Sequence, residues 1–304
     1  MNKFPIQLID NRTVLNEILT GHWLISYSGL LQLGHLFTNL GEIQEKGNDA
    51  NNRSENLLSF YNADYVKINP RTADEIPEGT IAVVNIIGPM TKYASWWMLG
   101  ANEVIYQLDF LNNHSNVAAI VGRVDGPGGS VSALPLFQDF ATRKKKPIVT
   151  LADNSLSLHK FIPDVIADYQ MAENNLVSRF GSYGVVSSWQ DATAYYEKMG
   201  VKFHEEYPDE SKHKNEIWRA FKEDEEKGRK MLKEMHLSPM AKDLQAIARA
   251  AHPNLIEEEG VLTGRTFRTD DAIKYNMINK QGNMMEAMQM AKALAEAYSI
   301  NNNY

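Results

Sequence analysis

The stretch VAAIVGRVDGPGGSVSALPLF, residues 117–137, carries the strongest structural pattern in the 304-residue chain. Its first eight residues are almost all apolar, which is typical of a strand buried on both faces of a parallel sheet. A glycine-rich turn follows at once, and the residues after the turn favour a helix. This order of strand, turn and helix predicts one unit of an α/β fold.

Similar units lie on either side of this stretch. The runs IAVVNIIGPM at 81–90 and PIVTLA at 147–152 predict two more buried strands. Helical patterns at 102–111 and 133–145 separate the three strands, so we expect a largely parallel sheet. Beyond residue 200 the chain is expected to be mainly helical, with helices at 217–235, 239–251 and 283–298.

The expected division of the chain has three parts. They are a helical N-terminal extension and linker at 1–75, an α/β core at 76–215, and a mainly helical part at 216–304 that completes the core.

The N-terminal extension is expected to be helical without spanning a membrane. Residues 18–41 contain no Asp, Glu, Lys or Arg, but they include four glycines and several polar side chains. A membrane span needs about 20 predominantly apolar residues. After Ser28, apolar residues recur at helical spacing, which predicts an amphipathic helix. The first residues also lack the apolar run of a secretory signal.

Composition excludes several classes of protein. The chain has 31 basic and 38 acidic residues, so its net charge is −7 with neutral histidines. This balance argues against a nucleic-acid partner, because such proteins normally carry a basic face. The absence of cysteine excludes disulfides, thiolate metal sites and a cysteine nucleophile. The eight histidines show no metal-binding spacing, so we expect neither a metal nor another cofactor.

The glycines after the strand at 117–124 are placed where a reaction could use them. Gly126, Gly128 and Gly129 leave the backbone free of side chains, so their N–H groups can point at a bound oxygen. The spacing fits neither a Walker loop nor a dinucleotide fingerprint. An oxyanion hole, a phosphate cradle and an ordinary Gly-Pro turn all remain open from spacing alone.

A wider series of segments points to one family. The series runs GTIAVVNIIGPMTKY, VDGPGGSV, PIVTLADN, GSYGV at 181–185, ESKHKNE at 210–216, and GVLTGRTFRTDDAIKYNMIN at 260–279. In this order and spacing it resembles the signal peptide peptidase A family of serine proteases, in particular its phage head-maturation branch. The resemblance covers residues 80–290. It implies a Clp protease/crotonase-type fold of stacked β/β/α units and a Ser–Lys dyad that cleaves peptide bonds.

The resemblance also assigns roles to individual residues. It implies that Gly128 and Gly129 supply the N–H groups of an oxyanion hole, and Gly126 stands where the family usually has serine. The segment SKHK places Ser211 in the family's glycine position and Lys214 in the position of the general base. A free lysine amine has a pKa of about 10.4 and is protonated at neutral pH. A lysine can therefore act as a base only where burial disfavours its charged form.

The nucleophile position departs from the family pattern. An ungapped alignment of residues 153–175 puts Leu158 in the serine position, with His159 and Lys160 where small residues are expected. A shift of one residue brings in Ser157, and Ser155 is a further alternative. Two interpretations therefore stay open: a peptidase with Ser157 and Lys214 as its dyad, or an inactive pseudoprotease with Leu158 at the nucleophile position.

The expected function follows from these alternatives. The resemblance implies a ring-like homo-oligomer that cleaves, or accompanies, peptide, capsid or scaffold proteins in the host cytoplasm or in the virion or prohead. A non-catalytic scaffold component on the same fold is the second possibility. A crotonase-type acyl-CoA enzyme is the third, and the lack of a CoA-binding pattern and the SKHKNE segment argue against it.

Overall fold

The computed structural model describes residues 17, 22–26, 29, 57–95, 98–189, 191 and 193–301. Most of the helix expected in the first 45 residues lies outside these ranges. At residues 23–25, which are described, that expectation is wrong, because they form a strand.

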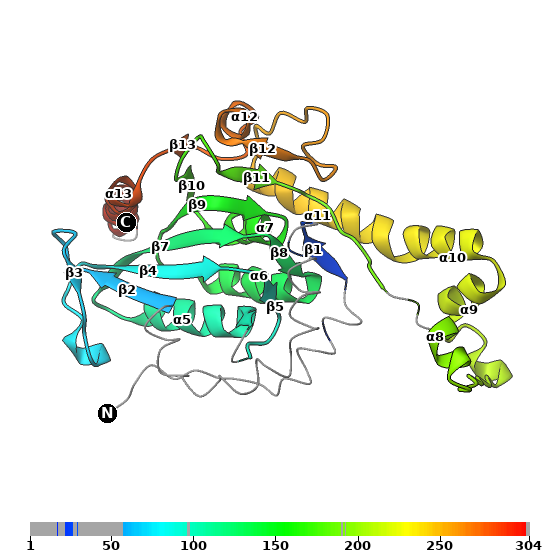
Figure 1. Ribbon diagram of the computed structural model, residues 1–304. Helices are drawn as coiled ribbons and strands as arrows, with labels where there is room; N and C mark the ends of the chain where they lie inside the picture. The colour runs from blue at the N-terminus through cyan, green and yellow to red at the C-terminus, as the bar shows by residue number, and fades with distance from the viewer. Residues whose placement is uncertain are drawn as a thin grey trace.

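A mixed sheet of nine strands forms the centre of the molecule (Figure 1). Its main path runs β12-β11-β9-β7-β4-β2-β3, and β10 and β13 lie off this path beside β9. Neighbours among β4, β7, β9 and β11 are parallel, whereas β2 and β12 run antiparallel to theirs. The strands are β2 (Leu58–Tyr61), β3 (Lys67–Ile68), β4 (Thr80–Ile87), β7 (Val117–Gly126), β9 (Ile148–Leu156), β10 (Tyr169–Ala172), β11 (Arg179–Gly181), β12 (Thr266–Arg268) and β13 (Lys280–Gln281).

Both faces of this sheet are buried. Because strand side chains alternate in direction, Ala82 and Val84 of β4 join one apolar cluster while Ile81 and Val83 join another. The first cluster is closed by α5 (Ala101–Asn113), α6 (Leu134–Arg143) and α7 (Leu158–Ile166), with α11 (Ser238–Ala251) against α7. The second is closed by α13 (Met284–Asn301). The predicted α/β architecture with a buried parallel core is confirmed.

A second, four-stranded sheet lies beside the first, in the order β1-β8-β5-β6. It consists of β1 (Trp23–Ile25), β5 (Met90–Thr91), β6 (Leu99–Gly100) and β8 (Gly128–Ser130). The β8 strand is the predicted glycine turn itself, and η2 (Val131–Ala133) leads from it into α6. Residues expected as linker also enter the fold, because β2 pairs with β4 and a short helix, η1 (Ala73–Glu75), follows β3.

Residues 193–237 form an arm that projects from the core, and α11 leads back to it (Figure 1). The arm contains α8 (Thr193–Lys198), η3 (Asp209–Ser211), α9 (Glu216–Glu223), α10 (Glu225–Leu232) and the π-helical turn η4 (Lys233–Leu237). The single helix predicted at 217–235 is broken at Asp224, whose carboxylate accepts the N–H groups of Glu226 and Lys227 and so begins a new helix. The described residues also include α12 (Thr269–Lys274). Among the described helices, none has the length and apolar character needed to cross a bilayer.

Candidate functional site

Ser157 stands at the sharp turn between β9 and α7. Its backbone has φ 55° and ψ −116°, outside the regions that non-glycine residues ordinarily adopt. The turn is held in place because the Ser157 N–H donates to the Gly181 carbonyl at 2.8 Å, and the Ser157 carbonyl accepts the Lys160 N–H at 2.8 Å. The hydroxyl does not cap the helix. A strained strand-to-helix turn also carries the serine of nucleophile elbows, but there the hydroxyl is exposed, whereas Ser157 is buried in this structure.

Leu158 is the first residue of α7 and points into the core. It is fully buried in the first apolar cluster. Its Cδ2 lies 2.8 Å from the place where a Cβ on Gly129 would stand, so Leu158 packs against the glycine strand, β8. The structure therefore places Ser157 at the turn and gives Leu158 a packing role. His159 and Lys160 are fully buried as well, so the bulk that replaces the expected small residues is accommodated inside the protein.

Ser155 has a structural partner of its own. Its hydroxyl donates to the His159 carbonyl at 2.7 Å. In a regular helix that carbonyl would accept the N–H of the residue four positions later, which is Pro163, and proline has no N–H. Ser155 thus satisfies the acceptor that the proline leaves unpaired, and this explains how α7 contains a proline.

Gly128 and Gly129 lie in strand β8. The sequence predicts bare amides at these residues, and that expectation is wrong: β1 pairs with β8 along its length, and Met90 of β5 pairs with Gly129. A Cβ on Gly128 would lie 2.0 Å from the Leu24 carbonyl oxygen, and Gly128 has φ +115°. Glycine is therefore needed here for the close approach of β1.

A buried polar cluster that the sequence did not indicate lies on α7. The Lys160 ammonium pairs with the Asp164 carboxylate, and both side chains are fully buried. The Tyr183 hydroxyl donates to Asp164 at 2.6 Å, and His252 Nε2 lies 2.8 Å from the same carboxylate. Burial opposes the charge on Asp164, but Lys160 and His252 hold its pKa well below the usual range. Lys160 and Asp164 are one helical turn apart, but no local pattern relates them to His252, since 88 positions separate Asp164 from His252.

The folded chain does not bring Lys214 beside Ser157. It is exposed, and it lies between η3 and α9, with its N–H donating to the Ser211 carbonyl at 2.9 Å. Figure 1 shows this segment on the arm, whereas α7 lies within the core. The structure brings Gly128, Gly129 and the β9–α7 turn into one neighbourhood and leaves Lys214 outside it.

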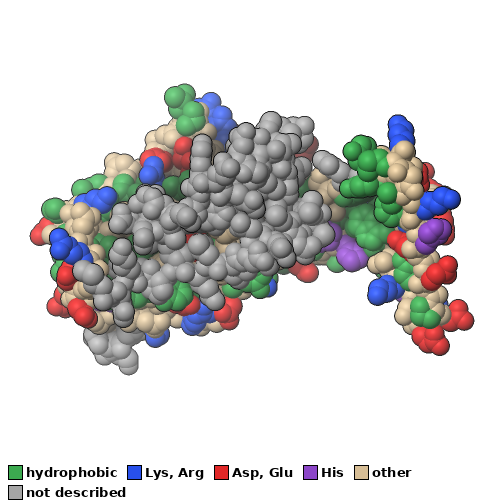
Figure 2. All heavy atoms as spheres, turned by 60° about the horizontal axis from the view of Figure 1, so that its bottom comes forward, with side chains coloured by type: hydrophobic (Ala, Val, Ile, Leu, Met, Phe, Trp, Pro, Cys, Tyr) green, Lys and Arg blue, Asp and Glu red, His purple; other side chains and the backbone are tan. Residues whose placement is uncertain are grey.

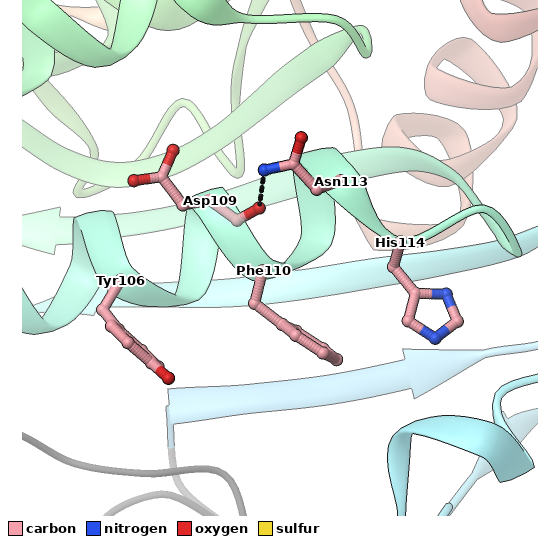
Figure 3. Close-up of a pocket in the computed structure, with 5 residues that line it drawn as sticks. All are labelled: Tyr106, Asp109, Phe110, Asn113 and His114. Atoms are coloured by element: carbon pink, nitrogen blue, oxygen red, sulfur yellow. Dashed lines mark hydrogen bonds between the residues drawn. The ribbon is translucent and has the colours of Figure 1, made fainter.

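A pocket elsewhere on the surface is lined by Tyr106, Asp109, Phe110, Asn113 and His114 of α5 and its C-cap (Figure 3). The Asn113 amide donates to the Asp109 carbonyl within the helix, and the His114 ring contacts the Ala73 carbonyl at 3.1 Å. These two polar groups hold α5 and its neighbour, and the residues that line the pocket do not include Ser157, Gly128 or Gly129.

Within the described ranges, no group of three or more His, Asp or Glu residues is arranged to hold a metal ion. No protein-family model matches the chain, and no curated protein matches it significantly.

Proposed function

We propose that this protein is a serine peptidase with a Clp protease/crotonase-type fold, in which Ser157 is the nucleophile. The backbone of Ser157 carries the proposal. A serine held at φ 55° between a buried strand and a helix costs of order 1–3 kcal/mol, and such strain gathers at functional sites. The ordered series of motifs that resembles the signal peptide peptidase A family supports the same assignment.

The surroundings of Ser157 suit a peptide substrate. The strand of Gly128 and Gly129 already pairs with an extended segment, β1, as it would with a substrate backbone. When Ser157 Oγ attacks a peptide carbonyl carbon, the negative charge forms on the carbonyl oxygen. N–H groups of the glycine strand could stabilise that oxygen only after β1 has left them, because β1 pairs with this strand in the structure. The C–N bond then breaks, the amine leaves with a proton, and water hydrolyses the serine ester.

The proton of Ser157 Oγ needs an acceptor. Because Lys214 lies on the arm and not beside Ser157 of the same chain, a Ser–Lys dyad requires Lys214 of one copy to reach Ser157 of another. The ring-like assembly implied by the resemblance would allow this. The arm also carries exposed apolar side chains suited to an interface, among them Tyr195, Met199, Phe203 and Trp218. Figure 2 shows hydrophobic side chains on the visible face of the arm.

A fluorophosphonate probe tests the proposal, since it reacts with an activated serine. The wild-type chain should be labelled at Ser157, as located by peptide mass spectrometry, and Ser157→Ala should abolish labelling. Lys214→Ala should reduce labelling at least about a hundredfold because the serine loses its base. Lys212→Ala, which removes a second exposed lysine of the same segment, should leave labelling unchanged and is the matched control.

A second candidate is a pseudoprotease that serves as a scaffold component. The exposed position of Lys214 favours it, because an isolated chain then has a serine without the expected base. A chain that assembles into a ring but is not labelled at Ser157 at any protein concentration would support this candidate and reject the peptidase. The capsid or scaffold partner, and a location in the host cytoplasm or prohead, are proposals that rest on the resemblance alone.

A further inference from the structure

Strand β1 comes from a part of the chain more than 100 residues before its partner β8. The register pairs Trp23 with Ser130, Leu24 with Gly129 and Ile25 with Gly128. Hydrogen bonds continue on both sides: the Val131 N–H donates to the His22 carbonyl at 3.0 Å, and the Ser26 N–H donates to the Pro127 carbonyl at 2.8 Å. In an antiparallel ladder the hydrogen-bonded pairs alternate, so Leu24 and Gly129 form the pair between them.

The other edge of β1 is also paired. The Trp23 N–H donates to the Val186 carbonyl at 3.0 Å, and the Val186 N–H donates to the Trp23 carbonyl at 2.9 Å. The segment that ends at Val186 begins at Gly181, whose carbonyl accepts the N–H of Ser157. β1 therefore lies between the two segments that flank the serine turn, which are β8 on one side and residues 181–186 on the other.

The side chains of β1 are held as firmly as its backbone. Trp23, Leu24 and Ile25 are 1%, 0% and 7% exposed. Three consecutive residues of a strand point alternately to both faces. The site between β8 and residues 181–186, which we call the groove, therefore buries apolar side chains above and below the peptide plane. The glycines of β8 leave room for this close approach, because a Cβ on Gly128 would lie 2.7 Å from the Ile25 Cα.

A second contact holds the N-terminal segment. The Glu17 carboxylate accepts the Lys92 N–H with both oxygens, at 3.0 and 3.1 Å, and the Ser132 hydroxyl. Lys92 follows β5 and Ser132 follows β8, so Glu17 is bound to the ends of two strands of the small sheet.

We propose that residues 22–26 are an internal competitor for the groove beside Ser157, and that the groove binds an extended peptide with consecutive large apolar residues only when β1 leaves it. This inference rests on the proposed function for the identity of the groove. A three-residue strand with hydrogen bonds on both edges and glycines on one side has the form of a bound peptide, here supplied in cis. The apparent affinity for a second peptide is reduced by the fraction of chains in which the groove is open.

The absence of cysteine from the chain allows β1 to be locked by a single disulfide. Trp23 and Ser130 are a directly opposed pair without mutual hydrogen bonds, a position at which the Cα separation suits a disulfide. The test uses the full chain with Trp23→Cys and Ser130→Cys, and the Ser157→Ala change added so that no reaction interferes. The probe is a fluorescein-labelled synthetic peptide with the sequence of residues 20–28, and binding is measured by fluorescence anisotropy.

The reduced protein should bind this peptide at least about tenfold more tightly than the oxidised protein, because oxidation holds the groove closed. A peptide with N-methylated Leu24 should not bind, since it cannot donate to the strand. The matched control is Trp23→Ser with Ser130→Cys, which cannot form the bridge and should bind equally in both redox states.

Equal binding by the oxidised and reduced forms, or no binding by a reduced form that circular dichroism shows to be folded, would overturn the inference. If the cysteine variant does not fold, Glu17→Gln in the otherwise unchanged chain replaces it. That variant loosens the second contact without altering the groove, and it should bind the peptide several-fold more tightly than wild type. Redox-dependent binding without fluorophosphonate labelling of wild-type Ser157 would support this inference and reject the peptidase. Labelling of wild-type Ser157 without redox-dependent binding would support the peptidase and reject this inference.

Discussion

The imidazole of His159 fills the space that any side chain at residue 126 would need. A Cβ on Gly126 would lie 2.3 Å from His159 Nε2, closer than non-bonded atoms approach. Under the proposed peptidase assignment both residues depart from the family pattern, with glycine where serine is usual and histidine where a small residue is usual. The structure explains the two departures together, because the larger residue at one position requires the smaller residue at the other.

Gly126→Ala should therefore destabilise the protein. The added methyl group clashes with a fully buried ring, and overpacking of this kind costs about 1–3 kcal/mol. His159→Ala in the same chain should recover part of that loss, so the two changes should be strongly non-additive. Urea unfolding of the wild type, both single variants and the double variant measures the coupling. Additive effects would show that the two side chains do not share this space.

His159 should also make stability depend on pH. Burial lowers its pKa from 6.5 to about 4, so below pH 6.5 the unfolded chain binds a proton that the folded chain does not. The stabilisation is present above pH 6.5 and is lost as pH falls toward 4, by up to roughly 3 kcal/mol. His159→Asn should flatten this part of the profile. Unfolding free energies measured from pH 7.5 to 4.5 in both proteins provide the check, and parallel profiles would contradict it.

Replacing one member of the buried Lys160–Asp164 pair should lower the stability of the protein far more than replacing both. Asp164→Leu leaves a buried ammonium without its carboxylate, which typically costs about 3–5 kcal/mol. Lys160→Met combined with Asp164→Leu should cost less than Asp164→Leu alone, since no uncompensated charge remains. Thermal unfolding at pH 7 compares the two. A double variant less stable than the single one would show that Tyr183 and His252 depend on the charges.

Local patterns predicted the three buried strands and the main helices because each is specified by its own run of apolar residues. Strand β1 was not predicted, since nothing near Trp23 indicates a partner at Ser130. The alignment puts Leu158 at the nucleophile position because it only counts residues, and sequence does not reveal the positive φ that the structure shows at Ser157. The cluster around Asp164 likewise exists only once α7 and α11 are packed together.

Ser155 and Pro163 should be coupled through the His159 carbonyl. Ser155→Ala leaves that buried acceptor unpaired, so we expect a loss of about 1–3 kcal/mol. In a chain that already carries Pro163→Ala, residue 163 has an N–H that can occupy the acceptor, and Ser155→Ala should then cost much less. A double-mutant cycle in urea tests this. The same loss in both backgrounds would mean that the Ser155 hydroxyl does not compensate for the proline.

The exposed aromatic surface of the arm should control both assembly and the reactivity of Ser157. Trp218 is 45% exposed and stacks on Phe221, with Trp189 against both rings. If the arm carries Lys214 to a neighbouring copy, Trp218→Glu should weaken that contact by introducing a charge that must be desolvated. Light scattering should then show smaller particles, and fluorophosphonate labelling of Ser157 should fall in parallel with particle size.

Leu176→Glu is the control, because Leu176 is 79% exposed and lies outside the arm, between β10 and β11. It should change neither particle size nor labelling. Mixing Ser157→Ala chains with Lys214→Ala chains gives the decisive result: a base supplied by another copy restores labelling in the mixture, although each variant alone is unlabelled. Labelling that is lost in Trp218→Glu while particle size stays constant would instead place the effect within one chain.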